Sequence, residues 1–390
     1  MGTSIDDGTD IDGSSDMTEQ AHPRTGFVSH EYYFWHHTGA SAGPLPYGLT
    51  IQPDAHPESP ATKRRLYGLL EVSGLLAQLG RIEPRVATVE ELTVFHTPAY
   101  VARVEELSNG VGGDAGELTP IGTGSYHIAR LSAGGAFAAA DAIMSGKVRN
   151  AYALIRPPGH HAEADRGRGF CVFANNVLLV HHLRRQHGIR RIAIVDWDVH
   201  HGNSQEGAFL SDPSVLTISL HQDNYYPPQS GGIDVTGEGA GRGANINVPL
   251  PPGSGHGAYV DAWQRVVVPA VRRYRPDFLI ASSGFDGSAM DPLGRNMATS
   301  ETYREIARIT TDLADELCGG RLLALHEGGY STAYVPFCGL ATLEAMSGIK
   351  TQIDDPYLPI FGGMGGQALQ PHQKVVIDAA AALAKQVPAP

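Results

Sequence analysis

From residue 150 onward, short continuous runs of apolar residues recur along the chain, and each run ends in polar or glycine-rich residues. Continuous rather than alternating apolar character is typical of strands in a parallel sheet that is covered on both faces. The runs and their polar ends are residues 150–161, 191–203, 215–223, 277–287 and 321–330. We therefore predict buried parallel strands whose carboxyl ends carry the polar side chains.

Helical segments are predicted between these strands, at about 174–187, 258–274 and 302–318. Alternating strands and helices give right-handed crossovers within one sheet. The predicted fold class is α/β, with a single three-layer domain over residues 26–390 and a central, mostly parallel sheet that has helices on both faces. The glycine- and proline-rich segment 227–257 is predicted to be the largest loop. A last helix, about 373–386, is expected to pack on the body or on another subunit of a homo-oligomer.

Composition narrows the classes of function. The 390 residues are 42% hydrophobic and 18% charged, which is enough for a large core. The net charge of −12 argues against binding to nucleic acid or to an anionic membrane. Three scattered cysteines suit a reducing cytoplasm, and no apolar run is long enough to cross a membrane. Residues 1–25 are acidic, and we predict a disordered segment there rather than a signal peptide.

Two acids and two histidines directly follow the apolar run 193–195. In an extended chain Asp196, Asp198 and His200 point to the same side, and an Asp and a His two residues apart form part of a divalent metal site. Asp286 follows another buried run between glycines and is the best third ligand. An isolated D-x-H more often caps a turn, but the matching acid favours one metal ion, zinc first and iron(II) as the alternative.

A second pair of histidines ends another predicted strand, in the segment RPPGHH. Its prolines and Gly159 predict a rigid turn that presents His160 and His161, and adjacent imidazoles suit acid–base chemistry near neutral pH. Asp196 and Asn203 are the expected partners. Because an aspartate stabilises an imidazolium more than an asparagine does, the two histidines are expected to have separate pKa values and separate roles.

Two other features have less specific patterns. In HEGGY, Gly328 and Gly329 free the backbone so that the phenol of Tyr330 could reach the site, although an exposed Tyr after glycines is more often a loop anchor. The pair His181–His182 lies within a predicted helix, and we interpret it as structural.

Seven segments in this order resemble the motifs of the histone deacetylase superfamily, whose members have the arginase–deacetylase fold. They are HPESPATKRR (56–65), RPPGHH (156–161), GFCVFANN (169–176), DWDVHHGN (196–203), ISLHQD (218–223), GFDGSAMDPLG (284–294) and HEGGY (326–330). The HHGN and HEGGY forms are most similar to class II enzymes and to bacterial histone deacetylase-like amidohydrolases. The resemblance implies hydrolysis of an N-acyl amide, such as acetyl-lysine, with one zinc ion per chain.

The resemblance also implies a role for each matching residue. The zinc ligands would be Asp198, His200 and Asp286; His161 would be the general base and acid, positioned by Asn203; His160, paired with Asp196, would be an electrostatic helper; and Tyr330 would bind the substrate carbonyl. The substrate-binding residues would be Phe170 and Tyr226 as aromatic walls, with Gly169, Leu293 and Glu117 near the rim. A structural potassium ion would use Asp196, Asp198, His200, Ser219 and Leu220.

Some residues depart from the family pattern. The loop 162–168 is more charged than in relatives, and Ser204 stands where they usually have Gly. Leu293 replaces the acidic residue of polyamine-selective relatives, which argues against a polyamine substrate. Glu117 could grip a substrate at the rim, or it could be a solvated loop residue.

Other functions are compatible with parts of this pattern. An arginase-like ureohydrolase would need two manganese ions and extra acids, but His200 is followed by His201 and Gly202, and Asp286 by Gly287 and Ser288, so a second metal lacks ligands. A non-catalytic module that binds acyl-lysine would not need both His160 and His161. The same amide hydrolysis could act on a small-molecule, polyamine or xenobiotic amide, and the sequence does not choose among these substrates.

Overall fold

The computed structural model describes residues 24–390, so the predicted disordered segment 1–25 lies almost wholly outside the described residues. Its last two residues, Arg24 and Thr25, are described, and Thr25 is buried and begins the first strand. No helix within 24–390 is long and apolar enough to cross a membrane.

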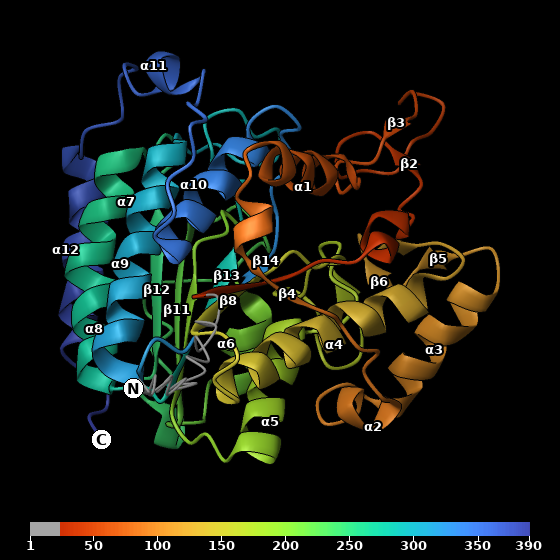
Figure 1. Ribbon diagram of the computed structural model, residues 1–390, viewed down its shortest axis with the longest axis horizontal. Helices are drawn as coiled ribbons and strands as arrows, with labels where there is room; N and C mark the ends of the chain where they lie inside the picture. The colour runs from red at the N-terminus through yellow and green to blue at the C-terminus, as the bar shows by residue number, and fades with distance from the viewer. Residues whose placement is uncertain (1–23) are drawn as a thin grey trace, which may run out of the picture.

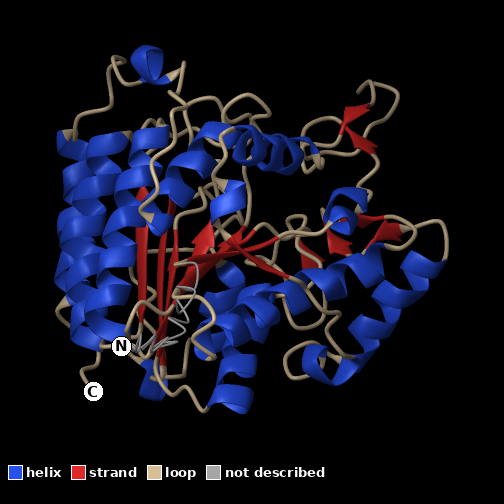
Figure 2. Cartoon of the chain, viewed as in Figure 1, coloured by secondary structure: helices blue, strands red, loops and turns tan. Residues whose placement is uncertain are grey.

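Eight parallel strands form the central sheet, in the order β12-β11-β10-β13-β14-β8-β1-β4 (Figures 1 and 2). In chain order their bounds are β1 Thr25–Val28, β4 Gly80–Ile82, β8 Asn150–Ala153, β10 Ile192–Asp196, β11 Val215–Gln222, β12 Asn245–Leu250, β13 Phe278–Ser283 and β14 Leu322–His326. All five predicted runs are strands of this sheet. The predicted α/β class with a parallel sheet is confirmed.

Helices cover both faces of the sheet, which gives the three predicted layers (Figure 1). One layer contains α1 Ala61–Val72, α7 His256–Ala262, α8 Val268–Tyr274, α9 Ser300–Cys318, α10 Val335–Ser347 and α12 Pro371–Ala384. The other is built on α3 Pro98–Asn109, α4 Ser125–Met144 and α5 Asn175–His187. The shorter helices are α2 Val89–Leu92, α6 Asn203–Phe209 and α11 Leu358–Phe361. Short strands also form three pairs outside the central sheet. These pairs are β2 Ala40–Ser41 with β3 Asp54–Ala55, β5 Gly113–Asp114 with β7 Pro120–Ile121, and β6 Gly116–Glu117 with β9 Gly167–Arg168.

The structure corrects several predicted elements. Strand β12 lies inside the predicted loop 227–257, where polar Asn245 and Asn247 alternate with apolar residues and hide the strand from a search for continuous runs. The predicted helix 258–274 begins at His256 and changes to a π-helical turn at Trp263–Val267 before α8. Helix α12 packs against β12 and α7 of the same chain, so it belongs to the body.

A buried ion network anchors the segment that leads from β8 to the paired histidines. The Arg156 guanidinium binds the Glu58 carboxylate at 2.8 Å, and Lys63 binds the other oxygen of Glu58 at 2.5 Å. Arg156 also donates to the carbonyl of His36 at 2.6 Å. Since all three ionic side chains are buried, the network fixes the start of RPPGHH against the N-terminal segment.

Candidate metal and catalytic site

The three predicted metal ligands meet at the carboxyl ends of neighbouring strands. Strands β10 and β13 pair in parallel with Asp196 opposite Ser282, and Asp198, His200 and Asp286 follow these strand ends. The Nδ1 atom of His200 lies 3.0 Å from Asp198 Oδ1 and 3.1 Å from Asp286 Oδ2. The three side chains are buried, and one donor atom of each lies within 4.8 Å of the others. Two carboxylates and an imidazole at this spacing fit a divalent metal.

Backbone groups hold the two carboxylates in place. Asp286 Oδ1 accepts from the Val199 N–H at 2.7 Å, and Asp198 Oδ2 accepts from the Gly328 N–H at 2.8 Å. Burial raises the pKa of Asp286 to about 6, and the charge of Asp198 adds to this effect. Burial also acts to raise the pKa of Asp198, but His160 and His200 outweigh it and hold that pKa well below the usual range. Close carboxylates in a buried site favour a bound cation.

The histidine pair has the partners expected from the sequence. Nδ1 of His160 lies 3.0 Å from Asp196 Oδ2, and Nδ1 of His161 lies 2.8 Å from Asn203 Oδ1. The rings are adjacent, with centroids 3.9 Å apart. Burial opposes the charged form of His160, but the carboxylates of Asp198 and Asp196 raise its pKa to about 10. Burial and the neighbouring His160 hold the pKa of His161 well below its ordinary value, so the two imidazoles carry different charges.

Tyr330 follows β14 on a turn that depends on glycine. Gly329 has φ +126°, and the Tyr330 N–H donates to Asp291 Oδ2 at 2.7 Å. Its ring meets Phe170 edge to face, with centroids 5.8 Å apart. Burial, with the nearby Asp286 charge, raises the pKa of Tyr330 well above the ordinary value, so the phenol keeps its proton.

A cavity of about 210 Å³ joins these groups to the surface. It is lined by Pro44, Leu118, His161, Gly169, Phe170, His200, Tyr225, Tyr226, Leu293 and Tyr330. The predicted substrate residues Gly169, Phe170, Tyr226 and Leu293 are thus brought together with the catalytic candidates. Glu117 is not among the lining residues; its carboxylate pairs with Arg168 at 3.2 Å.

Sequence reasoning missed three lining residues. Tyr225 stacks on His200 with ring centroids 5.6 Å apart, and its place beside Tyr226 was the available signal. Leu118 reaches the cavity because β6 pairs with β9, and its carbonyl accepts from the Phe170 N–H at 2.9 Å. Pro44 lies in an N-terminal turn far from every motif, and no local pattern marks it.

The unusual charges of the loop 162–168 largely compensate one another. Glu163 binds Arg166 and Arg168, each at 2.7 Å, and Arg168 also binds Glu117. Ser204 is buried, and its N–H donates to the carbonyl of His160 at 3.0 Å. The charges of Glu163, Arg166 and Arg168 beside the cavity are therefore paired.

Comparison with known proteins agrees with this geometry. The family model "Histone deacetylase domain" matches residues 56–346, more than half of the chain. The chain belongs to the histone deacetylase family. A histone deacetylase-like amidohydrolase of Pseudomonas aeruginosa is 48% identical over 336 residues, which cover 85% of this chain and 88% of that protein. The human polyamine deacetylase HDAC10 is 34% identical over 351 residues, 87% of this chain and 50% of that protein.

A solved structure supports the same assignment. The crystal structure of the HDA15 HD domain matches with a TM-score of 0.81 and 30% identity, over 93% of this chain and 95% of that one. This histone deacetylase family member is therefore a hydrolase of the deacetylase and amidohydrolase class, which acts on acylated amines.

Proposed function

We propose that the chain is a zinc-dependent deacetylase that removes an acetyl-like group from an N-acylated amine such as acetyl-lysine. The convergence of Asp198, His200 and Asp286 beside the cavity carries the proposal, since these donors would hold one zinc ion. When bound, zinc supplies Lewis-acid chemistry, because it polarises a carbonyl and makes water more acidic.

Residues of the chain itself would transfer the protons, bind the substrate carbonyl and balance the charge of the site. His161, neutral and held by Asn203, takes the proton of the attacking water and later gives a proton to the leaving amine. Tyr330 donates its phenol proton in a hydrogen bond to the carbonyl oxygen, on which negative charge develops. The charged His160, paired with Asp196, offsets the negative charge of the buried site.

The cavity supports a slender acyl-amine substrate. Its volume of about 210 Å³ is below the usual range for ligand pockets, roughly 300–1,000 Å³, and its walls include Phe170 and Tyr226. Such a channel suits the methylene chain of an acylated lysine. Leu293 places an apolar group at the wall, which favours this chain over a polyamine with a second charge. A small-molecule or xenobiotic amide of similar width remains the second candidate.

The rival chemistries gain no support from the site. His201 follows the metal ligand His200 in the chain. Its Nδ1 atom forms a hydrogen bond with Ser230 Oγ at 2.7 Å, and its Nε2 atom lies 3.3 Å from Glu206 Oε2. Both ring nitrogens therefore have partners other than a second metal ion. A two-manganese ureohydrolase would lack its second set of acids. A binding module would not require both histidines and Tyr330 around the cavity.

The proposal also includes a structural potassium ion, a cytoplasmic location and a homo-oligomer. A structural potassium ion would lie near Asp196 and Ser219, which are register partners on β10 and β11, with Leu220, Asp198 and His200 completing the set. The three cysteines are buried and free, which supports the predicted cytoplasmic location. A homo-oligomer stays a prediction.

We expect the purified enzyme to hydrolyse a fluorogenic acetyl-lysine peptide, and a hydroxamate chelator to stop the reaction. A panel of N-acyl amides that differ in acyl length and in the amine would then define the substrate, with acetyl preferred over long acyl groups. If no acyl amide in the panel gives chelator-sensitive turnover, the proposed function is wrong.

A second prediction concerns Gly328, which lies against both metal-binding carboxylates. A Cβ atom at this position would lie 2.1 Å from Asp286 Oδ2 and 2.7 Å from Asp198 Oδ2, so a methyl group must push them apart. Gly328→Ala is expected to weaken zinc binding about 10- to 100-fold, as changes around metal ligands typically do. Competition with a chromophoric chelator measures the affinity.

The matched control is Gly68→Ala, because a Cβ atom at Gly68 meets nothing within 4 Å. This variant should bind zinc as the unmodified chain does. Equal zinc affinity in Gly328→Ala and Gly68→Ala would contradict the assignment of the two carboxylates.

A further inference from the structure

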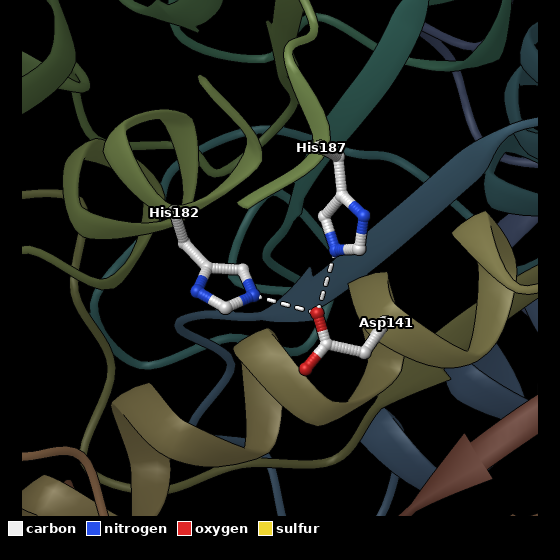
Figure 3. A group of neighbouring side chains, drawn as sticks. All are labelled: Asp141, His182 and His187. Carbon is white, nitrogen blue, oxygen red and sulfur yellow. Dashed lines mark hydrogen bonds and ion pairs between the residues drawn. The ribbon is translucent and has the colours of Figure 1, made fainter. Parts of the chain in front are cut away.

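Three side chains away from the cavity converge on one point between two helices (Figure 3). Asp141 lies on α4, and His182 and His187 lie on α5. The Nε2 atoms of both histidines are 2.7 Å from the same carboxylate oxygen, Asp141 Oδ1. One donor atom of each residue lies within 4.8 Å of the other two. Two imidazole nitrogens and a carboxylate oxygen form a donor set that zinc prefers in proteins.

The neighbours of His182 hold its ring in a fixed orientation. The ring stacks on Phe137, with centroids 4.6 Å apart and an interplanar angle of 9°, and its side chain is only 4% exposed. Its Nδ1 atom faces Glu91 Oε1 at 3.9 Å, and Arg85 in turn holds Glu91. A carboxylate on the far side of a ligating histidine is the usual outer partner of a metal site, because it orients the ring.

The other two side chains open the cluster to solvent. Asp141 is 43% exposed and His187 is 22% exposed, so an ion could enter and water could complete its coordination. Among residues 24–390, the ion pairs of Asp141 are with these two imidazoles and not with a lysine or arginine.

This cluster is separate from the catalytic candidates. Helix α5 begins beside them, where Asn176 donates to Ser282 and Glu327. It then runs 13 residues to His187, which at 1.5 Å per residue is roughly 20 Å. The cluster therefore lies on the C-terminal half of α5, whereas the catalytic candidates lie near its first turn.

We propose that Asp141, His182 and His187 form a second divalent cation site of the zinc type, which links α4 to α5 and takes no part in amide hydrolysis. Binding replaces the shared hydrogen bonds at Asp141 Oδ1 by bonds from both Nε2 atoms and the carboxylate to the ion. Each histidine then carries its proton on Nδ1, and the Nδ1–H of His182 points toward Glu91.

The number of zinc ions per chain tests this proposal. Full-length protein without a histidine tag is stripped with a chelator, equilibrated with micromolar free zinc and analysed by mass spectrometry of the metal. We expect two zinc ions in the unmodified chain and one in His187→Gln or Asp141→Asn, with deacetylase activity unchanged in both variants. His181→Gln is the matched control on the same helix, and it should keep both ions.

A background without the catalytic metal separates the two sites. In Asp286→Asn we expect one zinc ion, and in the double variant Asp286→Asn/His187→Gln we expect none. A single ion in the unmodified chain that is lost in Asp286→Asn would overturn the second site and leave the proposed function intact. A second ion that persists in both His187→Gln and Asp141→Asn would also overturn it.

Discussion

If the proposed function is right, Asp286→Asn is expected to abolish hydrolysis of acetyl-lysine, with kcat reduced about 1,000-fold or more, because the proposed catalytic zinc loses a ligand. The substitution keeps the shape of the side chain and removes its charge. Asp198 and His200 remain, but two protein ligands do not hold the ion firmly. The variant should still fold, since it can keep the hydrogen bond from the Val199 N–H. Metal content, circular dichroism and kcat are measured on the same preparation.

Asp277 provides the matched control for this variant. It lies at the start of β13, whereas Asp286 lies beyond the end of the same strand, and its carboxylate accepts from the N–H groups of Arg190 and Arg191. Asp277→Asn should retain zinc and activity. Near-normal turnover in Asp286→Asn, with its catalytic zinc retained, would show that this acid is not a ligand.

Tyr330→Phe is expected to lower kcat about 100-fold or more without changing zinc content, because one donor to the developing oxyanion is typically worth about 3 kcal/mol. The ring would keep its contact with Phe170, so the shape of the cavity is preserved. KM should change much less than kcat, since the hydrogen bond strengthens mainly in the transition state. Steady-state kinetics on the acetyl-lysine peptide separate the two constants.

Tyr303→Phe tests whether the loss is specific to this phenol. Tyr303 is a buried tyrosine of α9 whose hydroxyl has no hydrogen-bond partner among the described residues, and it does not line the cavity. Removing that hydroxyl should leave kcat unchanged. A similar kcat for Tyr330→Phe and Tyr303→Phe would exclude the proposed role of Tyr330.

The sequence predicted the centre of the fold better than its edges. Strands β10, β13 and β14 are buried on both faces, so their apolar residues are continuous and easily recognised. Strand β4 has three residues at one edge of the sheet, and β12 at the other edge includes polar Asn245 and Asn247. Only Ile82 is buried in β4, whereas β12 is mostly buried but includes two buried asparagines, so neither strand has a continuous apolar run.

The residues of the site also differ in how well the sequence predicts their positions. Asp198, His200 and Asp286 follow recognisable strands, so parallel pairing alone predicts their approach. Leu118 and Pro44 reach the cavity through loops whose paths depend on long-range contacts, such as the pairing of β6 with β9. The cluster of His182 with Asp141 was missed for a related reason, because it depends on how α4 packs against α5.

The Asp291 carboxylate links the turn that carries Tyr330 to the cavity wall that carries Leu293. It accepts from the N–H groups of Tyr330 and Leu293, while the Leu293 carbonyl contacts His200 Nε2 at 3.2 Å. Mutations that reshape this wall to admit a new substrate would therefore disturb the reaction chemistry at the same time. Changes of selectivity should instead be concentrated at Pro44 and Leu118, which line the cavity, because the loop 162–168 is bound through Glu163 to Asn203, the partner of His161.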